Sequence, residues 1–536
     1  MLDLKFLSEP CRNFCFLSSI IVNDGNAGGA EKIVFSSFVA GGKGILVFID
    51  PKTGDNESYE FPDDEGAWAL CLQDDNTLLV GTCARSGYLH VFDIPSRTWL
   101  ASYRTATETY IWNLVKASDG NVYGGTYGGC RLVKYDHSKG TLEDLGRMSE
   151  NEGNLYSRTV YPDLNGDGNI VIACMSATND LVVYNIYENK IVGTTKKQPV
   201  LPQANILADG TTFRTDGQEY VLTKNGVDTY YDFTVTPPPT AILGLTTDEN
   251  GVVWGSSGFG QTIFSYDPKT GANLNTKGVC SSGGEVYGIQ AINGKIYTAS
   301  YAGADTTKYD PTQPWNQREN LNPKTVANAK PYIRPTGFST LGPDGNFWTG
   351  WQSGYGTYGG GYSRLDVNTD EQTLWKNPVS EQAVSSLTAG DKYLYFTTDN
   401  SANGLLPKAE DVHLCVIDTD GNLVKDVVYK YGYHLHKPCF FNGKVYVPVN
   451  GALHIYDELL ENCEVKTFEN KIYELYNLPM SGKMLAVFND MTAVVDENGE
   501  IIEKVYDKPL HGRITIAKDE KIYITQESKL YEVIIS

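Results

Sequence analysis

Methionine, histidine and long apolar runs are all scarce in this sequence. Only 6 of its 536 residues are methionine and 7 are histidine, whereas 54 are glycine and 35 are tyrosine. No segment approaches the ~20 apolar residues that a membrane-spanning helix requires. Aromatic residues separated by glycine-rich turns are typical of twisted β-sheets. The sequence therefore predicts an all-β chain without long helices or a membrane span.

Basic residues are outnumbered by acidic ones. Lys and Arg total 44 against 65 Asp and Glu, so the formal net charge is -21. Such a charge repels phosphate backbones and anionic lipid surfaces. We therefore expect neither nucleic acid nor a membrane as a partner. An acidic surface also keeps a protein soluble.

The sequence also contains neither a closely spaced C-x-x-C pair nor the residue pattern of a signal peptide in its first 22 positions. The ten cysteines are spread along the chain without a C-x-x-C pair, which argues against a zinc framework or a dense disulfide scaffold. Most of them lie in strand-like runs such as WALCLQ, where a thiol acts as a small buried apolar group. Charged residues interrupt the first 22 positions, unlike the apolar region of a signal peptide. These features predict a cytoplasmic protein, or a secreted one if a signal peptide has been removed.

A recurring phrase is the main structural signal. Each copy has a strand pattern, a D-G or N-G turn, a second strand, a glycine loop, a third strand ending in Asp and a fourth strand. Two copies are residues 112–146 (WNLVKASDGNVYGGTYGGCRLVKYDHSKGTLEDLG) and residues 243–271 (LGLTTDENGVVWGSSGFGQTIFSYDPKTG). Short strands separated by turn residues at this period predict the blades of a β-propeller.

The residue that ends the third strand serves to count the copies. Ten copies carry it, at Asp50, Asp93, Asp136, Asn185, Asp267, Asp310, Asp366, Asp418, Asp457 and Asp496. Two further units lack it, one around residues 219–223 and one at residues 529–535. Because propellers typically close with four to eight blades, about twelve four-stranded units predict tandem β-propellers in two rings rather than one very large ring. Divisions of six plus six and seven plus five both fit.

The two chain ends are expected to meet in one blade. The last unit shows three strands only, while residues 2–7 form a strand pattern without partners of their own. We therefore predict that residues 2–7 pair with residues 529–535 or with a neighbouring strand, because this leaves no long unpaired edge.

This pairing implies that one ring is inserted into the other. The corresponding assignment places residues 1–233 and 505–536 in one propeller portion and residues 240–504 in a second group of blades. Irregular stretches at 234–239 (TVTPPP) and 310–335 are the candidate crossings between the rings, because proline removes strand hydrogen-bond donors.

Known catalytic and metal motifs are absent or incomplete. DLNGDGNIVI opens like a calcium loop at Asp163, but the twelfth position, which should be Glu, is Cys174, so we interpret the segment as a hairpin turn. No G-x-S-x-G, H-E-x-x-H, Walker or dinucleotide motif stands in a suitable context. The cofactor is unknown, and a divalent metal is one candidate.

His434 and His436 in YGYHLHKPCFF are the only close pair of histidines. On a strand, residues two apart point to the same face, so both rings could ligate a metal or transfer a proton together. The alternative is a pair of hydrogen-bonded core or surface imidazoles. We expect this face to meet a channel or pocket with an aromatic or Arg side chain from another unit.

Alignment of the units predicts which side chains line a central channel, since the start of each first strand should face it. Aromatic, arginine and histidine residues gather at these positions, which are Trp68, Tyr110, Trp112, Tyr156, Arg158, Glu285, Tyr287, Arg334, His434, His436, His511 and Arg513. Arg provides a bidentate clamp for a carboxylate, and Tyr or Trp provides a flat wall for a sugar ring. The alternative is that each ring is a packing residue and each Arg part of a solvated rim.

Residues 241–271 and 110–146 resemble units of the streptogramin (virginiamycin B) lyase family and of the two-component-regulator propellers. The likeness rests on D-x-N-G-x-V-W-G and Y-D-P-K-T-G. It implies a propeller fold, and for the lyases a channel with histidines and a metal. Those lyases carry an H…E-x-H arrangement, whereas this chain has H-x-H at His434 and His436.

Two functions fit these features. The first is a carbohydrate-active enzyme, a lyase or glycosidase, that acts on an acidic oligosaccharide at a propeller channel mouth, by analogy with propellers of those activities. Its proposed catalytic residues are His434, His436, Tyr156 and Tyr287, and its proposed substrate-binding residues are Tyr110, Trp112, Arg158, Arg334, His511 and Arg513. The second is a non-catalytic propeller scaffold that binds protein partners or another small acidic ligand.

Overall fold

The computed structural model describes residues 1–24, 29–201, 205–281, 283–408, 410–430 and 432–535. These residues form strands and turns without a helix, as the composition predicted. None of them therefore belongs to a helix that is long and apolar enough to cross a membrane. All ten cysteines are free thiols, and nine of them are buried.

The chain folds into two compact units. Unit 1 consists of Met1–Arg12 and Pro239–Ser536, and unit 2 consists of Asn13–Pro238. The two chain crossings run beside each other, because Arg12 bridges Pro239 and the Asn13 backbone N–H donates to the Pro238 carbonyl at 3.1 Å. The proline-rich stretch at 234–239 does contain one of the crossings, whereas 310–335 lies inside unit 1.

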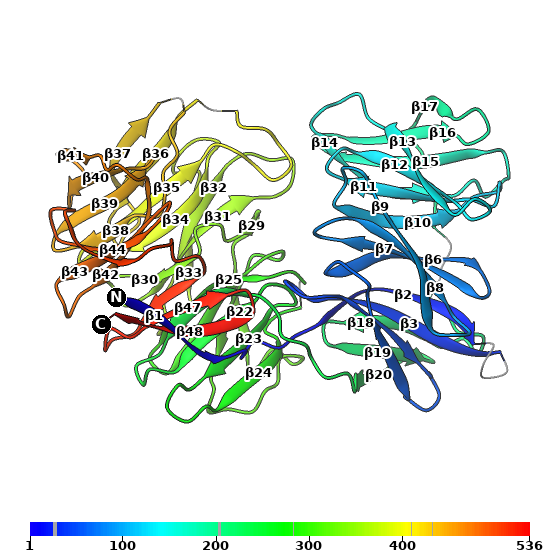
Figure 1. Cartoon of the computed structure of the whole chain (residues 1–536), viewed down its shortest axis with the longest axis horizontal. Helices are drawn as coiled ribbons and strands as arrows, with labels where there is room; N and C mark the ends of the chain where they lie inside the picture. The colour runs from blue at the N-terminus through cyan, green and yellow to red at the C-terminus, as the bar shows by residue number, and fades with distance from the viewer. Residues whose placement is uncertain (25–28, 202–204, 282, 409, 431, 536) are drawn as a thin grey trace. The chain divides into compact units, whose positions relative to one another are not determined.

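The described part of unit 1 contains seven antiparallel sheets, six of four strands and one of five (Figure 1). The first three are β21 (Ile242–Thr247), β22 (Val253–Ser257), β23 (Thr262–Tyr266), β24 (Asn273–Gly278); β25 (Val286–Ile292), β26 (Lys295–Ser300), β27 (Asp305–Tyr309), β28 (Lys324–Asn328); and β29 (Tyr332–Arg334), β30 (Ser339–Leu341), β31 (Phe347–Ser353), β32 (Gly360–Leu365), β33 (Gln372–Lys376). The next three are β34 (Ala383–Ala389), β35 (Leu394–Asp399), β36 (Val412–Ile417), β37 (Leu423–Tyr429); β38 (Cys439–Phe441), β39 (Lys444–Val449), β40 (Ala452–Asp457), β41 (Cys463–Lys466); and β42 (Ile472–Leu478), β43 (Lys483–Phe488), β44 (Thr492–Val495), β45 (Ile501–Tyr506).

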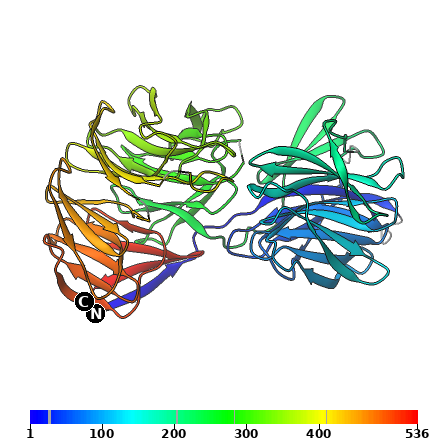
Figure 2. The ribbon, with the colours of Figure 1, turned by 90° about the horizontal axis from the view of Figure 1, so that it is seen from above.

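The seventh sheet joins the two ends of the chain. It has the order β1 (Leu2–Ser8), β48 (Lys529–Ile535), β47 (Ile522–Gln526), β46 (Ile514–Ile516). Leu2 pairs with Ile535 and Phe6 pairs with Tyr531, so the predicted pairing of the N-terminal segment with the last unit is confirmed. Both termini lie together at this sheet (Figure 2).

A separate hydrophobic core fills each gap between successive sheets of unit 1. One further core joins the last sheet to the first, where Tyr523 and Leu530 pack with Val253. The strands are thus buried on both faces, as expected where sheets stack face to face.

Unit 2 contains four successive four-stranded groups and one three-stranded sheet. The groups are β2 (Cys15–Asp24), β3 (Ala30–Phe38), β4 (Ile45–Ile49), β5 (Asn56–Glu60); β6 (Gly66–Asp74), β7 (Thr77–Cys83), β8 (Tyr88–Asp93), β9 (Thr98–Arg104); β10 (Tyr110–Lys116), β11 (Val122–Tyr127), β12 (Arg131–Asp136), β13 (Thr141–Arg147); and β14 (Asn154–Tyr161), β15 (Asn169–Ser176), β16 (Asn179–Asn185), β17 (Lys190–Thr195). The three-stranded sheet is β18 (Thr212–Asp216), β19 (Glu219–Lys224), β20 (Val227–Asp232). Separate cores join successive groups, and another joins β18–β20 to the first group through Phe213 and Phe35.

The described residues thus contain twelve blade-like groups of strands, seven sheets in unit 1 and five groups in unit 2, where the four four-stranded groups are joined by hydrogen bonds into one sixteen-stranded sheet. The grouping differs from the sequence assignment at both chain ends: residues 1–12 and 505–536 belong with residues 239–504, not with residues 13–233. The physical reason is that the last sheet packs on β21–β24, which brings all sheets after Pro239 into one body.

The recurring Asp at the end of each third strand stabilises the turn that follows. Its side-chain oxygen accepts backbone N–H groups two to four residues further on, as Asp50 does from Lys52 at 2.8 Å and Asp418 does from Asn422 at 2.8 Å. Asp and Asn favour this local bond, which mimics a backbone turn. The DLNGDGNIVI segment is a hairpin turn between β14 and β15, as predicted.

A β-bulge recurs in the first strand of most sheets and connects the fold to the candidate sites. In β6, β10, β14, β21, β25, β34 and β42 the pairing with the second strand skips a residue, and β6 and β14 each carry a second such shift. The skipped residues include Trp68, Trp112, Arg158, Leu243, Tyr287, Ser385 and Tyr473. A bulge turns its extra side chain out of the ladder.

Candidate functional site

Unit 1 contains a cavity of about 480 Å³ that is lined by segments of all seven described sheets. The bulge residues Leu243, Tyr287, Ser385 and Tyr473 line it, and so do His434, His436, Lys437, Glu474 and Arg513. Because the first strands supply most of the lining, the repeated bulge explains why these side chains converge.

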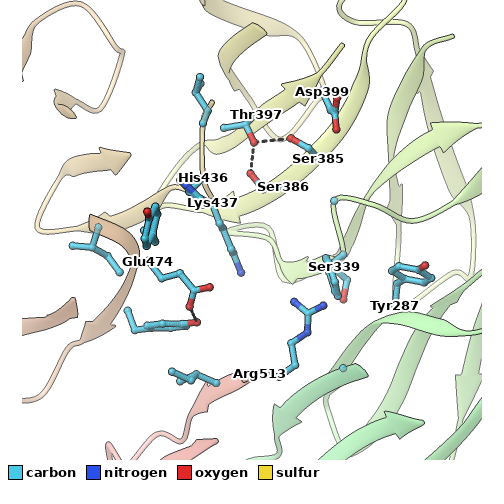
Figure 3. A pocket seen from close by; sticks show the side chains of 18 of the residues that line it. Tyr287, Ser339, Ser385, Ser386, Thr397, Asp399, His436, Lys437, Glu474 and Arg513 are labelled. Atoms are coloured by element: carbon cyan, nitrogen blue, oxygen red, sulfur yellow. Dashed lines mark hydrogen bonds between the residues drawn. The ribbon is translucent and has the colours of Figure 1, made fainter. Parts of the chain in front are cut away.

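Two cations extend into the cavity without forming an ion pair to a described residue. Figure 3 shows Lys437 and Arg513 pointing into the same space from different sheets. Neither side chain forms an ion pair or a hydrogen bond with any residue that the structure describes. Lys437 is an exposed residue, yet the protein around its ammonium group lowers its pKa by desolvation, an effect that Glu474 opposes in part.

An aromatic ring supports one of these cations. The Arg513 guanidinium carbon lies 4.5 Å from the centre of the Phe338 ring, a cation–π geometry. Phe338 has a φ of 55°, a left-handed conformation that is unfavourable for a bulky residue. Its backbone N–H donates to the Pro335 carbonyl at 2.9 Å, which closes the turn that holds this conformation. Strained backbone of this kind is concentrated at functional sites.

The two histidines contact each other and the next sheet. Their ring centres are 4.7 Å apart, and the His436 ring lies 5.3 Å from the ring of Tyr473 on β42. The pair precedes β38 in an extended segment that is held where Leu435 bridges Val449. Burial, with a smaller contribution from His434, lowers the pKa of His436 to about 4. His436 is therefore neutral at pH 7, and the pair faces a pocket as the sequence predicted.

The remaining lining combines two carboxylates, Asp399 and Glu474, with neutral polar groups. Glu474 accepts a hydrogen bond from the Tyr476 hydroxyl at 2.6 Å, and burial raises the pKa of Tyr476. The hydroxyl groups of Ser385 and Ser386 lie 2.9 and 2.5 Å from that of Thr397 (Figure 3). Hydroxyl groups can both donate and accept, which suits a ligand that carries hydroxyls.

A second polar cluster adjoins the cavity at Tyr287. Arg334 donates from Nη1 to the Tyr287 hydroxyl at 2.6 Å, and its guanidinium carbon lies 4.0 Å from the centre of the Tyr301 ring. Glu285 is near enough to Arg334 to interact electrostatically, but its buried Oε2 has no hydrogen-bond partner among the described residues. Burial raises the pKa of Glu285 to about 7 despite the opposing effect of Arg334.

Four of the sequence-predicted site residues belong to unit 2. Tyr110, Trp112, Tyr156 and Arg158 lie together there: the Tyr110 and Trp112 rings stack at 4.9 Å, and the guanidinium carbon of Arg158 is 3.8 Å from the centre of the Trp112 ring. Trp68 from β6 completes this cluster, 5.5 Å from Trp112. The predicted set is therefore two sets in two separate units.

Three further findings refine the predicted site. Arg334 does not line the cavity, and His511 lines a neighbouring groove instead. No cluster of three or more His, Cys, Asp and Glu side chains in the described parts of the chain could hold a metal ion. The sequence interpretation missed Lys437, Glu474 and Tyr473. Tyr473 could have been found, since it follows Ile472 in its unit as Tyr287 follows Val286.

Comparisons with known proteins give similarity of overall structure only. No family model matches the chain, and no curated protein matches it. The extracellular domain of BT4673, a proposed one component system of B. thetaiotaomicron, has a TM-score of 0.37 at 12% identity, covering 100% of this chain and 82% of that one. PorZ, an essential surface component of the type-IX secretion system of Porphyromonas gingivalis, has a TM-score of 0.41 at 9% identity, covering 99% of this chain and 86% of that one.

Proposed function

We propose that unit 1 is a binding module that takes a small acidic ligand, of the acidic-sugar class, into its cavity. The observation that carries this proposal is the pair of cations, Lys437 and Arg513, that line the cavity without forming an ion pair with any described residue, although the carboxylates of Asp399 and Glu474 line it too. Other lysines of this chain are paired, since Lys32, Lys295 and Lys308 each lie within 3 Å of a carboxylate.

The chemistry of these cations favours a carboxylate ligand. Charge-assisted hydrogen bonds to a carboxylate are stronger than neutral ones, and Arg can bind both carboxylate oxygens at once. The walls supply rings at Tyr287, Phe338 and Tyr473 and hydroxyls at Ser385 and Thr397. Rings beside hydroxyl groups suit a ligand with a flat face and polar edges, as a sugar has.

The same proposal includes the architecture around the cavity. We infer that the seven sheets of unit 1 form one propeller and the five strand groups of unit 2 another, a tandem arrangement. The core between the last and the first sheet of unit 1 supports ring closure there. In such a ring the cavity is the central channel.

A second candidate is a lyase activity in the same cavity, and the contact between His436 and Tyr473 favours it. His436 is neutral at pH 7 because its pKa is lowered to about 4 by burial, so its ring can accept a proton, as a weaker base than an ordinary imidazole. Lys437 and Arg513 would hold the carboxylate next to the carbon that loses the proton. Tyr156 and Arg158 have no part in this candidate because they lie in unit 2.

Titration calorimetry with galacturonic acid and with galactose tests the binding proposal. We expect the acid to bind and the neutral sugar to bind at least tenfold more weakly. Lys437→Met and Arg513→Met should each weaken binding of the acid by about 10- to 100-fold, as expected from the 1.5–3 kcal/mol of a hydrogen bond to a charged group. Lys392→Met, an exposed residue between β34 and β35 that does not line the cavity, is the matched control.

Equal affinity for both sugars, or an equal loss of affinity in Lys392→Met, would contradict the proposal.

A separate assay tests the lyase candidate. Incubation with an acidic oligosaccharide should release an unsaturated product that absorbs ultraviolet light, and His436→Ala should abolish the release without weakening binding of galacturonic acid. If the protein binds the acidic sugar but releases no unsaturated product, the lyase candidate is wrong and only the binding function is retained.

A further inference from the structure

A groove of about 680 Å³ adjoins the cavity in unit 1. Gly512 and Arg513 line both of them, and His511, Gln526, Lys529 and Tyr531 line the groove alone. The groove lies where the seventh sheet meets β21, since Ile242 also contributes to it. Arg513 thus faces two adjacent spaces.

Backbone contacts fix this boundary. The Thr525 backbone N–H donates to the Arg513 carbonyl at 3.0 Å, and the Arg513 backbone N–H donates to the Thr525 hydroxyl at 3.0 Å. Gly512 has a φ of 142°, and a Cβ there would lie 1.7 Å from the Thr525 carbonyl oxygen. Only glycine permits so close an approach. The segment that carries His511 and Arg513 is therefore held firmly against the end of β47.

The groove carries positive charge on a chain of net charge -21. Lys529 and Arg513 line it together with His511, against the single carboxylate of Glu527. None of the three basic side chains forms an ion pair or a hydrogen bond with a residue in the described part of the chain. Lys437 and Arg513 in the cavity and Lys529 in the adjoining groove are thus three cations, along adjacent spaces, without an ion pair to a described residue.

We infer that the ligand is an acidic oligosaccharide with a carboxylate on successive rings, one ring in the cavity and the next in the groove at Lys529. This inference rests on the proposed binding function and names the length and class of its ligand. One carboxylate meets Lys437 and Arg513, and the following one meets Lys529. Tyr531 and Gln526 provide a ring face and an amide beside Lys529, the same combination of ring and neutral polar group as in the cavity. This combination favours a sugar chain over an acidic peptide.

The test compares galacturonic acid with its linear trimer in calorimetric titrations of the whole chain. We expect the trimer to bind at least tenfold more tightly than the monomer. Lys529→Met should remove this gain and leave the monomer affinity unchanged, and His511→Ala should reduce it in part. Lys518→Met is the matched control, because Lys518 is exposed at the opposite end of β46 and β47 and should alter neither affinity.

The outcomes separate the inference from the proposed function. Equal affinities for monomer and trimer, or a trimer affinity unchanged in Lys529→Met, overturn the inference while monomer binding upholds the function. A short polyglutamate peptide that binds as tightly as the trimer and loses affinity in Lys529→Met overturns the choice of a saccharide. If galacturonic acid itself does not bind, the proposed function and the inference fall together.

Discussion

Replacing Glu285 by Gln should stabilise unit 1 at neutral pH. The pKa of Glu285 is raised from 4.5 to about 7 by burial, which Arg334 opposes only in part. The folded state therefore binds this proton more tightly than the unfolded state, so stability falls as pH rises from 4.5 to 7 and stays reduced above that range. A shift of this size corresponds to about 3 kcal/mol at pH 8. Gln keeps the shape of the side chain without this penalty.

The assay is thermal unfolding of the wild type and of Glu285→Gln at pH 8 and pH 4. For a unit of about 300 residues, a gain of ~3 kcal/mol corresponds to a rise in Tm of about 5 °C at pH 8. At pH 4 both states hold the proton, so the two proteins should unfold together. Glu249→Gln, at an exposed position between β21 and β22, should change neither transition. A gain of equal size at both pH values, or no gain at pH 8, would refute the reasoning.

Three further outcomes are expected. Burial, with a smaller contribution from His434, lowers the pKa of His436 to about 4. The neutral imidazole therefore stabilises the fold above pH 6.5, and this contribution is lost as the pH falls toward 4. In urea titrations, His436→Gln should lose less stability than the wild type over that pH interval. Leu2→Ala should lower the free energy of unfolding by about 2 kcal/mol since Leu2 is buried beside β48, whereas Asp3→Ala on the exposed face of the same strand should change it by less than about 0.5 kcal/mol. A thiol reagent should label one cysteine of the folded protein quickly, and Cys463→Ser should abolish that signal, because Cys463 is the exposed thiol of the ten; two fast thiols would disagree.

Local features of the fold could be read from the sequence because they depend on neighbouring residues. Asp418 marks the end of a third strand since its side chain bonds the backbone of the turn that follows. The pairing of β1 with β48 was also predictable, because a three-stranded last unit requires one more strand. The grouping of the sheets into units could not be predicted from the sequence, because it depends on contacts such as Tyr523 with Val253, which are far apart in the chain.

Only those residues of the candidate site that follow a local strand pattern could be predicted from the sequence. Tyr287 and Trp112 stand at the start of first strands, where a bulge turns the side chain away from the ladder, and both were named from the alignment of units. Lys437 was missed because it precedes β38, a strand of three residues whose start no alternation marks. The division of the site between two units followed from tertiary packing alone.

The most direct test of the binding proposal is a crystal structure of the chain with an acidic trisaccharide bound. The account predicts one carboxylate of the sugar between Lys437 and Arg513 and the next ring in the groove beside Lys529. A sugar bound instead at the Trp112 cluster of unit 2, with the cavity of unit 1 holding none of it, would contradict the account.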